Sequence, residues 1–132
     1  MLKVKIFSFS FLRGGIPEDP SGNGGGFVLD CRFIHNPAKH PEFMPLTGKD
    51  PEVKSFLDSL YEMQKFLNEV YRIIDEACEK YMKRNFTDLM VSFGCTGGQH
   101  RSVYSAEKLK DHLANKFKDS ILLEVIHQDI PR

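Results

Sequence analysis

Cysteine is scarce in this sequence, and its three cysteines show no CxxC spacing. They are Cys31, Cys78 and Cys95. An odd number of cysteines without that spacing indicates neither a disulfide framework nor a thiolate zinc site. We therefore expect a protein of a reducing compartment, with no metal site.

Long apolar runs and an excess of one charge sign are also absent. No segment approaches the roughly 18 consecutive apolar residues that a membrane span needs, and no small-residue cleavage site follows a hydrophobic stretch. The sequence therefore predicts a cytoplasmic protein with no membrane partner. Lysine plus arginine number 18, as do aspartate plus glutamate, so the formal net charge is zero. This balance argues against a nucleic-acid footprint over the whole domain, although it is compatible with a local basic cleft.

The remaining composition is typical of one compact domain over residues 1–132. Of these 132 residues, 41% are hydrophobic and 27% are charged. A chain of this length buries about two-thirds of the surface that it exposes when unfolded, which is enough for a hydrophobic core without disulfides.

Hydrophobic patterning predicts an alternation of strands and helices. Since a strand, a loop, a helix and a strand follow one another after residue 88, that segment reads as a βαβ unit. We therefore expect an α/β fold with a mainly parallel four-stranded sheet flanked by helices. The strands are predicted over 4–11, 27–33, 88–93 and 121–126, and the helices near 51–58, 60–84 and 101–117. The third strand is expected to be covered on both faces, because it is largely apolar.

Two of the helix starts carry capping signals. Asp50 precedes Pro51 and looks like an N-cap. Ser59 followed three residues later by Glu62 has the form of a capping box. These signals predict that a short helix ends near residue 58 and that a second, longer helix then begins.

The apolar residues between 53 and 81 recur at steps of three and four, a sustained helical period. A coiled coil is one interpretation, but a single helix would be about 45 Å long, which exceeds the width of a compact domain. Two helices packed on the sheet are therefore favoured, with an oligomer interface on the exposed part of the stripe as the alternative. Four further apolar residues widen the stripe into a packing face, namely Leu57, Phe66, Ile73 and Cys78.

A glycine-rich stretch at 22–26 could be mistaken for a phosphate-binding loop. The chain contains no GxxxxGK[ST] motif, and no helical pattern follows this stretch. It is therefore interpreted as a mobile loop.

The most informative segment runs from Gly94 to Ser102, between a buried strand and a helix. The free N–H groups at a helix start favour anions, and two adjacent glycines let the backbone approach a phosphate closely. The remaining side chains add hydroxyl, imidazole and guanidinium donors. The candidate ligand-binding residues here are Cys95, Thr96, Gly97, Gly98, Gln99, His100, Arg101 and Ser102.

The same segment fits a second chemistry. Cys95 and Arg101 are separated by five residues and followed by Ser102, which is the CX5R[ST] spacing of cysteine phosphatases. In that reading a loop of amides cradles phosphate while the Cys95 thiolate attacks phosphorus. Gly94 stands where those enzymes usually have histidine, and no general-acid aspartate loop can be assigned. We therefore rank a cysteine-dependent phosphatase second and expect no catalytic residue in the first reading.

The run GCTGGQHRSVY over residues 94–104 strongly resembles the signature of the C-terminal domain of the RapZ RNase adapter family. Further segments resemble that family's motifs in the same order along nearly the whole chain. These segments are 8–9, 15–17, 30–37, 45–50 and 127–130.

The resemblance implies a fold similar to a phosphofructokinase subdomain and a ligand such as an amino-sugar phosphate. In some members the domain also binds small regulatory RNAs and presents them to a ribonuclease. Full-length members carry an N-terminal ATPase domain with a Walker A motif. Because this chain has no such motif, it looks like a stand-alone C-terminal domain, for which we expect neither nucleotide hydrolysis nor a cofactor.

Three residues outside the loop complete the expected site. Arg32 is either an ion-pair partner of Asp30 or a second phosphate clamp, and the family motif includes it. Asn36 either initiates a turn or binds sugar hydroxyls. His127 ends the last strand, so parallel strands would place it at the same sheet edge as Gly94. Three other histidines, His35, His40 and His112, lack the spacing of a metal cluster.

Overall fold

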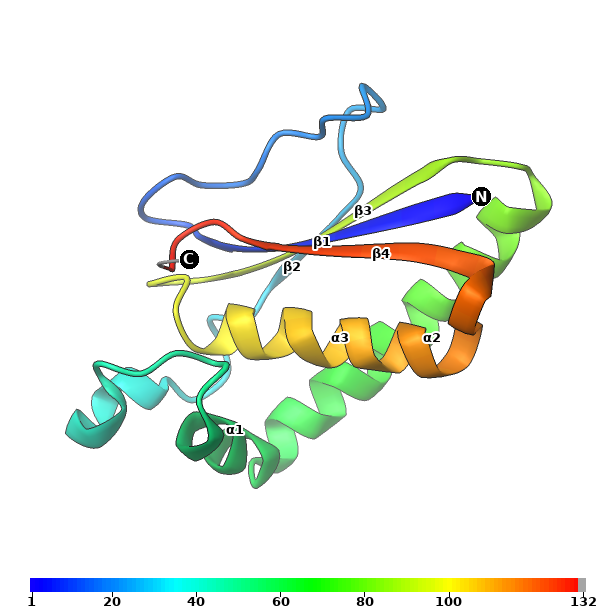
Figure 1. The fold of residues 1–132 in the computed structure, drawn as a ribbon. Helices are drawn as coiled ribbons and strands as arrows, with labels where there is room; N and C mark the ends of the chain where they lie inside the picture. Colours follow the sequence, from blue (N-terminus) through cyan, green and yellow to red (C-terminus); the bar gives the residue numbers. More distant parts are fainter. Residues whose placement is uncertain (131–132) are drawn as a thin grey trace.

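A computed structural model describes residues 1–130, and Figure 1 shows its ribbon. The strands are β1 (Leu2–Ser10), β2 (Phe27–Asp30), β3 (Asp88–Cys95) and β4 (Ile121–His127). The helices are α1 (Pro51–Asp58), α2 (Tyr61–Lys83) and α3 (Arg101–Phe117). Short 3-10 turns cover Pro37–Lys39, Pro41–Phe43 and Lys118–Ser120. None of the helices within residues 1–130 is long and apolar enough to cross a membrane.

The sheet has four strands in the order β2-β3-β1-β4, and every neighbouring pair is parallel. This confirms the predicted α/β class. In β1, Ser10 lies in register with Cys95 of β3, and Ser8 lies in register with His127 of β4. The carboxyl ends of these strands therefore meet at one edge of the sheet, where ligands of open α/β sheets usually bind.

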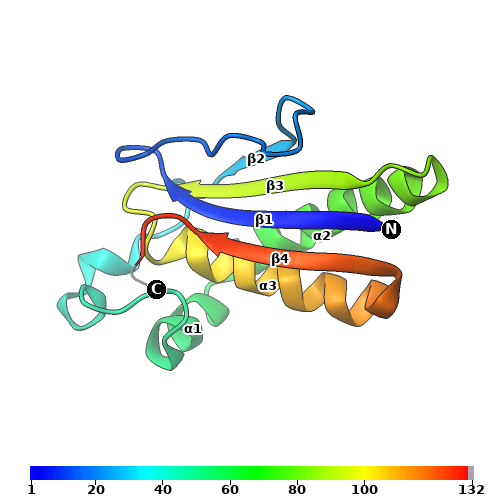
Figure 2. The same cartoon turned by 45° about the horizontal axis from the view of Figure 1, so that its top comes forward.

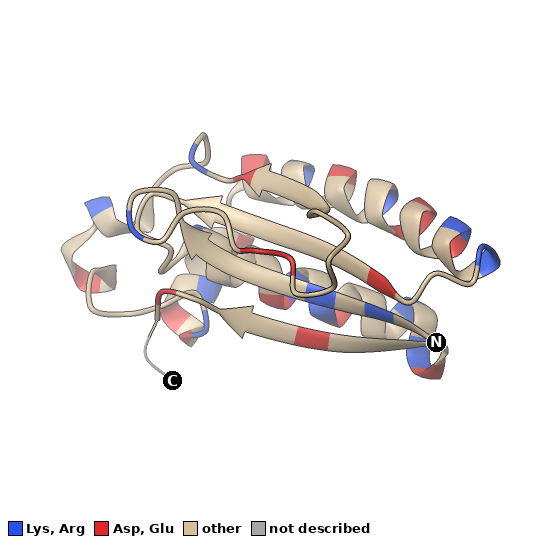
Figure 3. Cartoon of the chain, turned by 90° about the horizontal axis from the view of Figure 1, so that it is seen from above, with Lys and Arg blue, Asp and Glu red and all other residues tan. Residues whose placement is uncertain are grey.

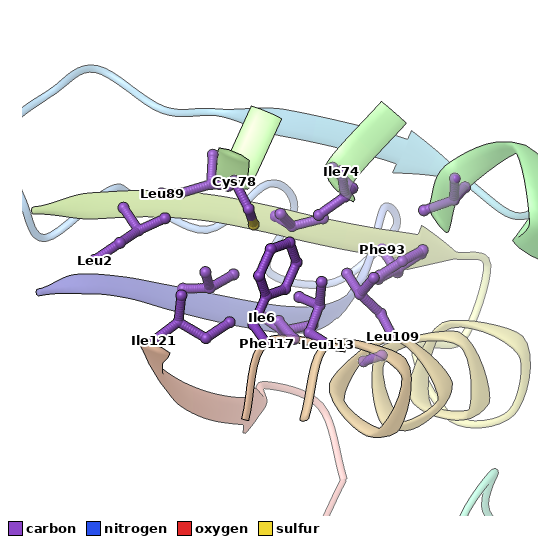
Figure 4. Packing of buried hydrophobic residues seen from close by; sticks show 14 of the residues in the cluster. Leu2, Ile6, Ile74, Cys78, Leu89, Phe93, Leu109, Leu113, Phe117 and Ile121 are labelled. Atoms are coloured by element: carbon purple, nitrogen blue, oxygen red, sulfur yellow. The ribbon is translucent and has the colours of Figure 1, made fainter. Parts of the chain in front are cut away.

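Helices α2 and α3 lie together against one face of the sheet (Figures 1 and 2). The strand residues that point to that face alternate with those that do not, as the pleat of a strand requires. Figure 4 shows the contact from close by, with Ile74 and Cys78 of α2 and Leu109 of α3 directed toward Ile6 and Phe93 of the sheet. This interlocked layer is the main hydrophobic core.

The other face of the sheet carries no helix, and the segment 11–26 crosses it (Figure 2). Phe11 packs edge-on against Phe9 at a centroid distance of 4.7 Å. Near the other end of the sheet, a Cβ added at Gly26 would lie 2.0 Å from the Met90 carbonyl oxygen, so this backbone contact requires glycine. The expectation that β3 is covered on both faces is therefore confirmed, but a loop rather than a helix covers the second face.

The predicted bounds of the helices are confirmed to within one residue, whereas the capping box is wrong. Leu60, not Ser59, is the N-cap of α2. The Ser59 hydroxyl donates to the Phe56 carbonyl, and the Glu62 carboxylate accepts the backbone N–H of His35. Asp50 is the N-cap residue of α1 but makes no side-chain cap, because its carboxylate accepts the N–H of Thr47 instead.

One residue of the predicted packing face points elsewhere. Ile73 is 52% exposed, whereas its neighbour Ile74 is 1% exposed. Successive residues of a helix are turned by about 100°, so both cannot face the core. The buried face of α2 follows Ile74, and Ile73 lies outside it.

A second, smaller core joins α1 and the first half of α2 to the start of α3. Its largest members include Leu57, Met63 and Tyr104, together with Ile34 from the loop after β2. The Tyr104 hydroxyl donates to Asp58 and accepts from the Gln64 amide. This core holds the segment 31–50 beside the loop between β3 and α3.

Candidate functional site

The loop 96–100 leaves the sheet after Cys95 and enters α3 at Arg101. Gly98 has a φ of +67°, and a Cβ added there would lie 2.8 Å from the Ser10 nitrogen. An added Cβ at Gly97 would meet nothing within 4 Å. The loop is therefore pressed against the end of β1 at Gly98 and faces open space at Gly97.

The backbone amides of this loop are available to a ligand. Within residues 1–130, none of the N–H groups of residues 96–103 donates to a backbone or side-chain acceptor. The first helical bond of α3 runs from the Tyr104 N–H to the His100 carbonyl, at 2.9 Å. We call this set of amides the anion cradle, since unpaired N–H groups and the helix dipole favour negative charge.

Arg101 is buried beneath the cradle, with 3% of its surface exposed. Its Nη1 donates to the carbonyl oxygens of Arg32 and Ile34, at 2.9 and 2.8 Å. Its Nε has no partner within residues 1–130. The guanidinium therefore fastens the segment after β2 to the start of α3 and leaves a positive charge under the loop.

The His100 side chain also contacts the backbone of the neighbouring segment. Its Nε2 lies 2.8 Å from the Phe43 carbonyl oxygen, so this nitrogen is the donor. Burial lowers the pKa of His100 below its ordinary 6.5, and the hydrogen bond that His100 donates to the Phe43 carbonyl offsets only part of this shift. Burial therefore favours the neutral imidazole.

Gln99 completes this set of positioning contacts. The Gln99 side-chain amide donates to the backbone carbonyls of Met44 and Leu46, at 2.7 and 2.6 Å. The Gln99 backbone carbonyl accepts the N–H of Gly48. Three consecutive side chains of the loop thus hold the neighbouring segment 32–48 through its backbone.

Cys95 lies at the end of β3 with its side chain in the main core, where it is 2% exposed. Its Sγ is 3.2 Å from the Ser102 hydroxyl oxygen. Cys31 is buried in the same core, and that burial raises the pKa of its thiol. The two thiols are therefore packed as small core groups.

Two residues at the edge were not among the predicted site residues. The Ser10 hydroxyl donates to the Thr96 carbonyl at 2.6 Å, and the Ser10 N–H donates to the Asp129 carboxylate at 2.7 Å. Asp129 also contacts the loop, because its Cβ would lie 3.0 Å from a Cβ on Gly98. The signal in the sequence was the serine at position 10, a polar residue between Phe9 and Phe11 at the carboxyl end of the first strand.

His127 reaches the same edge, as the parallel strands required. Its Nδ1 lies 2.7 Å from the Ser8 hydroxyl oxygen and its Nε2 lies 2.7 Å from the Glu107 carboxylate. Sequence reasoning named His127 and missed Glu107, which lies 20 residues away along the chain. Both ring nitrogens of His127 thus have protein partners.

Arg32 and Asn36 lie on the loop that follows β2. The Arg32 guanidinium makes a bidentate ion pair with Asp30, at 2.7–3.0 Å, and stacks over Phe11 at 3.9 Å from the ring centroid. Hydrogen bonding to Arg32 lowers the pKa of Asp30. The Asn36 side-chain Oδ1 accepts the N–H of Ala38 and caps the turn 37–39. In the structure, Arg32 is therefore the ion-pair partner of Asp30, and Asn36 initiates a turn.

In sum, the structure gathers the loop 96–102, Ser10, His127 and Asp129 at the carboxyl edge of a parallel sheet. Among residues 1–130, no group of three or more His, Cys, Asp or Glu side chains could hold a metal ion. Fold and loop together define an α/β domain with unpaired amides at its sheet edge.

The family of this domain follows from comparison with known proteins. The family model described as the RapZ C-terminal domain matches residues 2–131, so the chain belongs to that family. A nucleotide-binding protein of Fervidobacterium nodosum is 39% identical over 127 residues, which are 96% of this chain and 42% of that protein. Nucleotide-binding proteins of Koribacter versatilis and Bacillus licheniformis are 36% and 38% identical over 98% of this chain. The chain spans about two fifths of the length of these curated relatives.

Proposed function

We propose that this domain binds the phosphate group of a small phosphorylated metabolite and acts as a sensor or adapter without a catalytic step of its own. The observation that carries the proposal is the anion cradle, a run of unpaired amides at residues 96–103. Such amides at the start of a helix satisfy phosphate oxygens directly, and the helix dipole adds to the attraction. The relatives are named nucleotide-binding proteins, which supports a phosphorylated class of ligand.

The proposed roles of the side chains follow from their contacts. Thr96 is exposed at the start of the loop and can add a hydroxyl donor to a phosphate. Gln99, His100 and Arg101 act as positioning residues, because their side chains bind backbone carbonyls. Arg101 also supplies charge, since a buried guanidinium stays protonated.

The phosphate of an amino sugar fits this edge better than the phosphate of a sugar without an amine. Asp129 lies against Gly98, and its Oδ2 accepts the N–H of Ser10. A carboxylate so close to a phosphate site would repel a purely anionic ligand, whereas it would attract the ammonium group of an amino sugar. We therefore place the ligand's phosphate at the cradle and its amine toward Asp129. Arg32, Asn36 and His127 lie on the flanking segments as proposed outer contacts.

Isothermal titration calorimetry tests the proposal with a matched set of ligands. The set contains glucosamine 6-phosphate, glucose 6-phosphate, glucosamine, inorganic phosphate and ATP. We expect glucosamine 6-phosphate to bind most tightly, glucosamine to show no binding, and Asp129→Asn to remove most of the preference for the amine. Arg101→Lys should weaken binding at least tenfold, while Arg72→Ala on the exposed face of α2 should leave it unchanged. Binding of none of the phosphorylated ligands would overturn the proposal, as would an equal loss in Arg72→Ala.

The phosphatase alternative gains no support from this geometry. A nucleophile must reach the substrate, and the Cys95 side chain is 2% exposed and directed into the core. RNA and a ribonuclease remain partners that the family resemblance implies. Figure 3 shows acidic and basic residues interspersed along the helices, with no stripe of one sign in that view.

A further inference from the structure

We propose that His35 and His40 form a site for a divalent copper or nickel ion, separate from the anion cradle. His35 is exposed and His40 is partly buried, and their Nε2 atoms lie 2.9 Å apart. They flank the turn Pro37–Lys39 on the loop between β2 and α1. Imidazole is the side chain that these metals bind most readily in proteins.

The distance between the two nitrogens favours one coordination geometry over another. An imidazole nitrogen binds a first-row divalent metal at about 2.0–2.1 Å. Two ligands at 90° are then about 2.9 Å apart, whereas two tetrahedral ligands are about 3.3 Å apart. The observed 2.9 Å matches the square-planar or octahedral arrangement of copper(II) and nickel(II) more closely than the tetrahedral arrangement of zinc.

The backbone holds both histidines in place. Asn36 caps the turn through the N–H of Ala38, and the His40 N–H donates to the Pro37 carbonyl at 2.9 Å. Pro41 follows His40 directly and has a fixed φ. The two nitrogens therefore approach each other across a turn that hydrogen bonds and prolines already define.

Aromatic rings support the two imidazoles. The Phe56 ring of α1 lies 5.8 Å from the His35 ring and 5.0 Å from the His40 ring, centroid to centroid. The Phe43 ring lies 5.8 Å from the His40 ring. These contacts restrict the rotation of the imidazoles, so less conformational entropy is lost when a metal binds.

Both imidazoles bind a metal in their neutral form. The present contact needs one Nε2 that donates and one that accepts, so one ring carries its proton on Nε2. When both Nε2 atoms bind the metal, that ring moves its proton to Nδ1 and stays neutral. Glu62 accepts the backbone N–H of His35 at 2.9 Å, and its carboxylate partly offsets the charge of the dication. Because residues 1–130 offer no group of three protein ligands, water or solution anions fill the other positions.

Copper(II) titration of the full chain in a weakly coordinating buffer tests the site by calorimetry and electron paramagnetic resonance. We expect one strong copper site per chain, a spectrum with two nitrogen ligands, and tighter binding of copper than of zinc. His35→Ala and His40→Ala should each weaken copper binding at least tenfold and remove one nitrogen from the spectrum. His112→Gln is the control, because His112 is bound to Asp75 between α2 and α3 and should not affect this site.

Three outcomes would overturn the proposal: absence of copper binding by the wild type, unchanged affinity in His35→Ala and His40→Ala, or an equal loss in His112→Gln. Tighter binding of zinc than of copper would contradict the 90° geometry. Circular dichroism of each variant checks that the substitutions leave the fold intact.

Discussion

At the scale of single residues, the polar side chains beside the cradle bind backbone carbonyls of other loops. His100 reaches Phe43, and Arg101 reaches Arg32 and Ile34. The sequence marked these side chains as candidate phosphate contacts because of their position at a helix start. It could not show their acceptors, because these lie 57 to 69 positions away along the chain.

The lowered pKa of His100 predicts a pH dependence of stability. Because the folded-state pKa lies below the unfolded value of about 6.5, the unfolded chain binds more protons in that range. The free energy of unfolding should therefore be fully retained above pH 6.5 and fall as the pH drops through the folded pKa. His100→Gln keeps a donor for the Phe43 carbonyl but cannot titrate, so it should show a weaker fall. Urea denaturation of both proteins between pH 8 and 5 measures this difference, and parallel pH profiles would contradict it.

At the scale of elements, the connection between β3 and α3 was the best-predicted part of the chain. Its helix was expected near 101–117 and spans Arg101–Phe117. Alternating or helical apolar periods extend over many residues and therefore fix an element well. A cap depends on a single side chain. Ser59 binds the Phe56 carbonyl three residues earlier, and Glu62 binds the distant N–H of His35.

Two adjacent glycines of that connection should differ in their tolerance of alanine. Gly98 has a positive φ, and a Cβ there would lie 2.8 Å from the Ser10 nitrogen, whereas Gly97 has open space. Gly98→Ala should cost roughly 2–4 kcal/mol of unfolding free energy, from left-handed strain and the backbone clash. Gly97→Ala should change the free energy of unfolding by less than about 1 kcal/mol. Chemical denaturation of the two variants compares them, and equal effects would contradict this account of the loop.

At the scale of the whole molecule, the domain is a parallel sheet with helices on one face and a loop on the other. The sequence predicted the parallel sheet but not its one-sided cover, because the glycine-rich segment 11–26 has no period that reveals where it lies. The exposed apolar residues Val28 and Leu122 lie on β2 and β4, at the edges of the sheet. The His35–His40 contact was equally hidden, because the H-x4-H spacing alone, without a further pair of cysteine or histidine ligands, does not mark a metal site.

The layered core makes two neighbouring isoleucines a matched pair. Ile74 is 1% exposed and packs into the main core, and Ile73 is 52% exposed. Ile74→Ala should cost roughly 2–5 kcal/mol, as for other buried aliphatic side chains. Ile73→Ala should cost less than about 1 kcal/mol. Thermal and urea unfolding measure both changes, and a large cost at Ile73 would indicate that a further surface covers this side of α2.

Amide chemical-shift mapping by NMR is the most direct test of the anion cradle. On titration with glucosamine 6-phosphate, the account predicts the largest shifts at the amides of residues 96–103, with smaller shifts at Ser10 and Asp129. The glycine-rich stretch 22–26 is the internal control, because it has similar backbone freedom but no adjacent helix start. Shifts confined to residues 96–103 and their neighbours would support the claim that these amides bind phosphate. Shifts centred on 22–26, or saturable binding that leaves the amides of 96–103 unmoved, would contradict it.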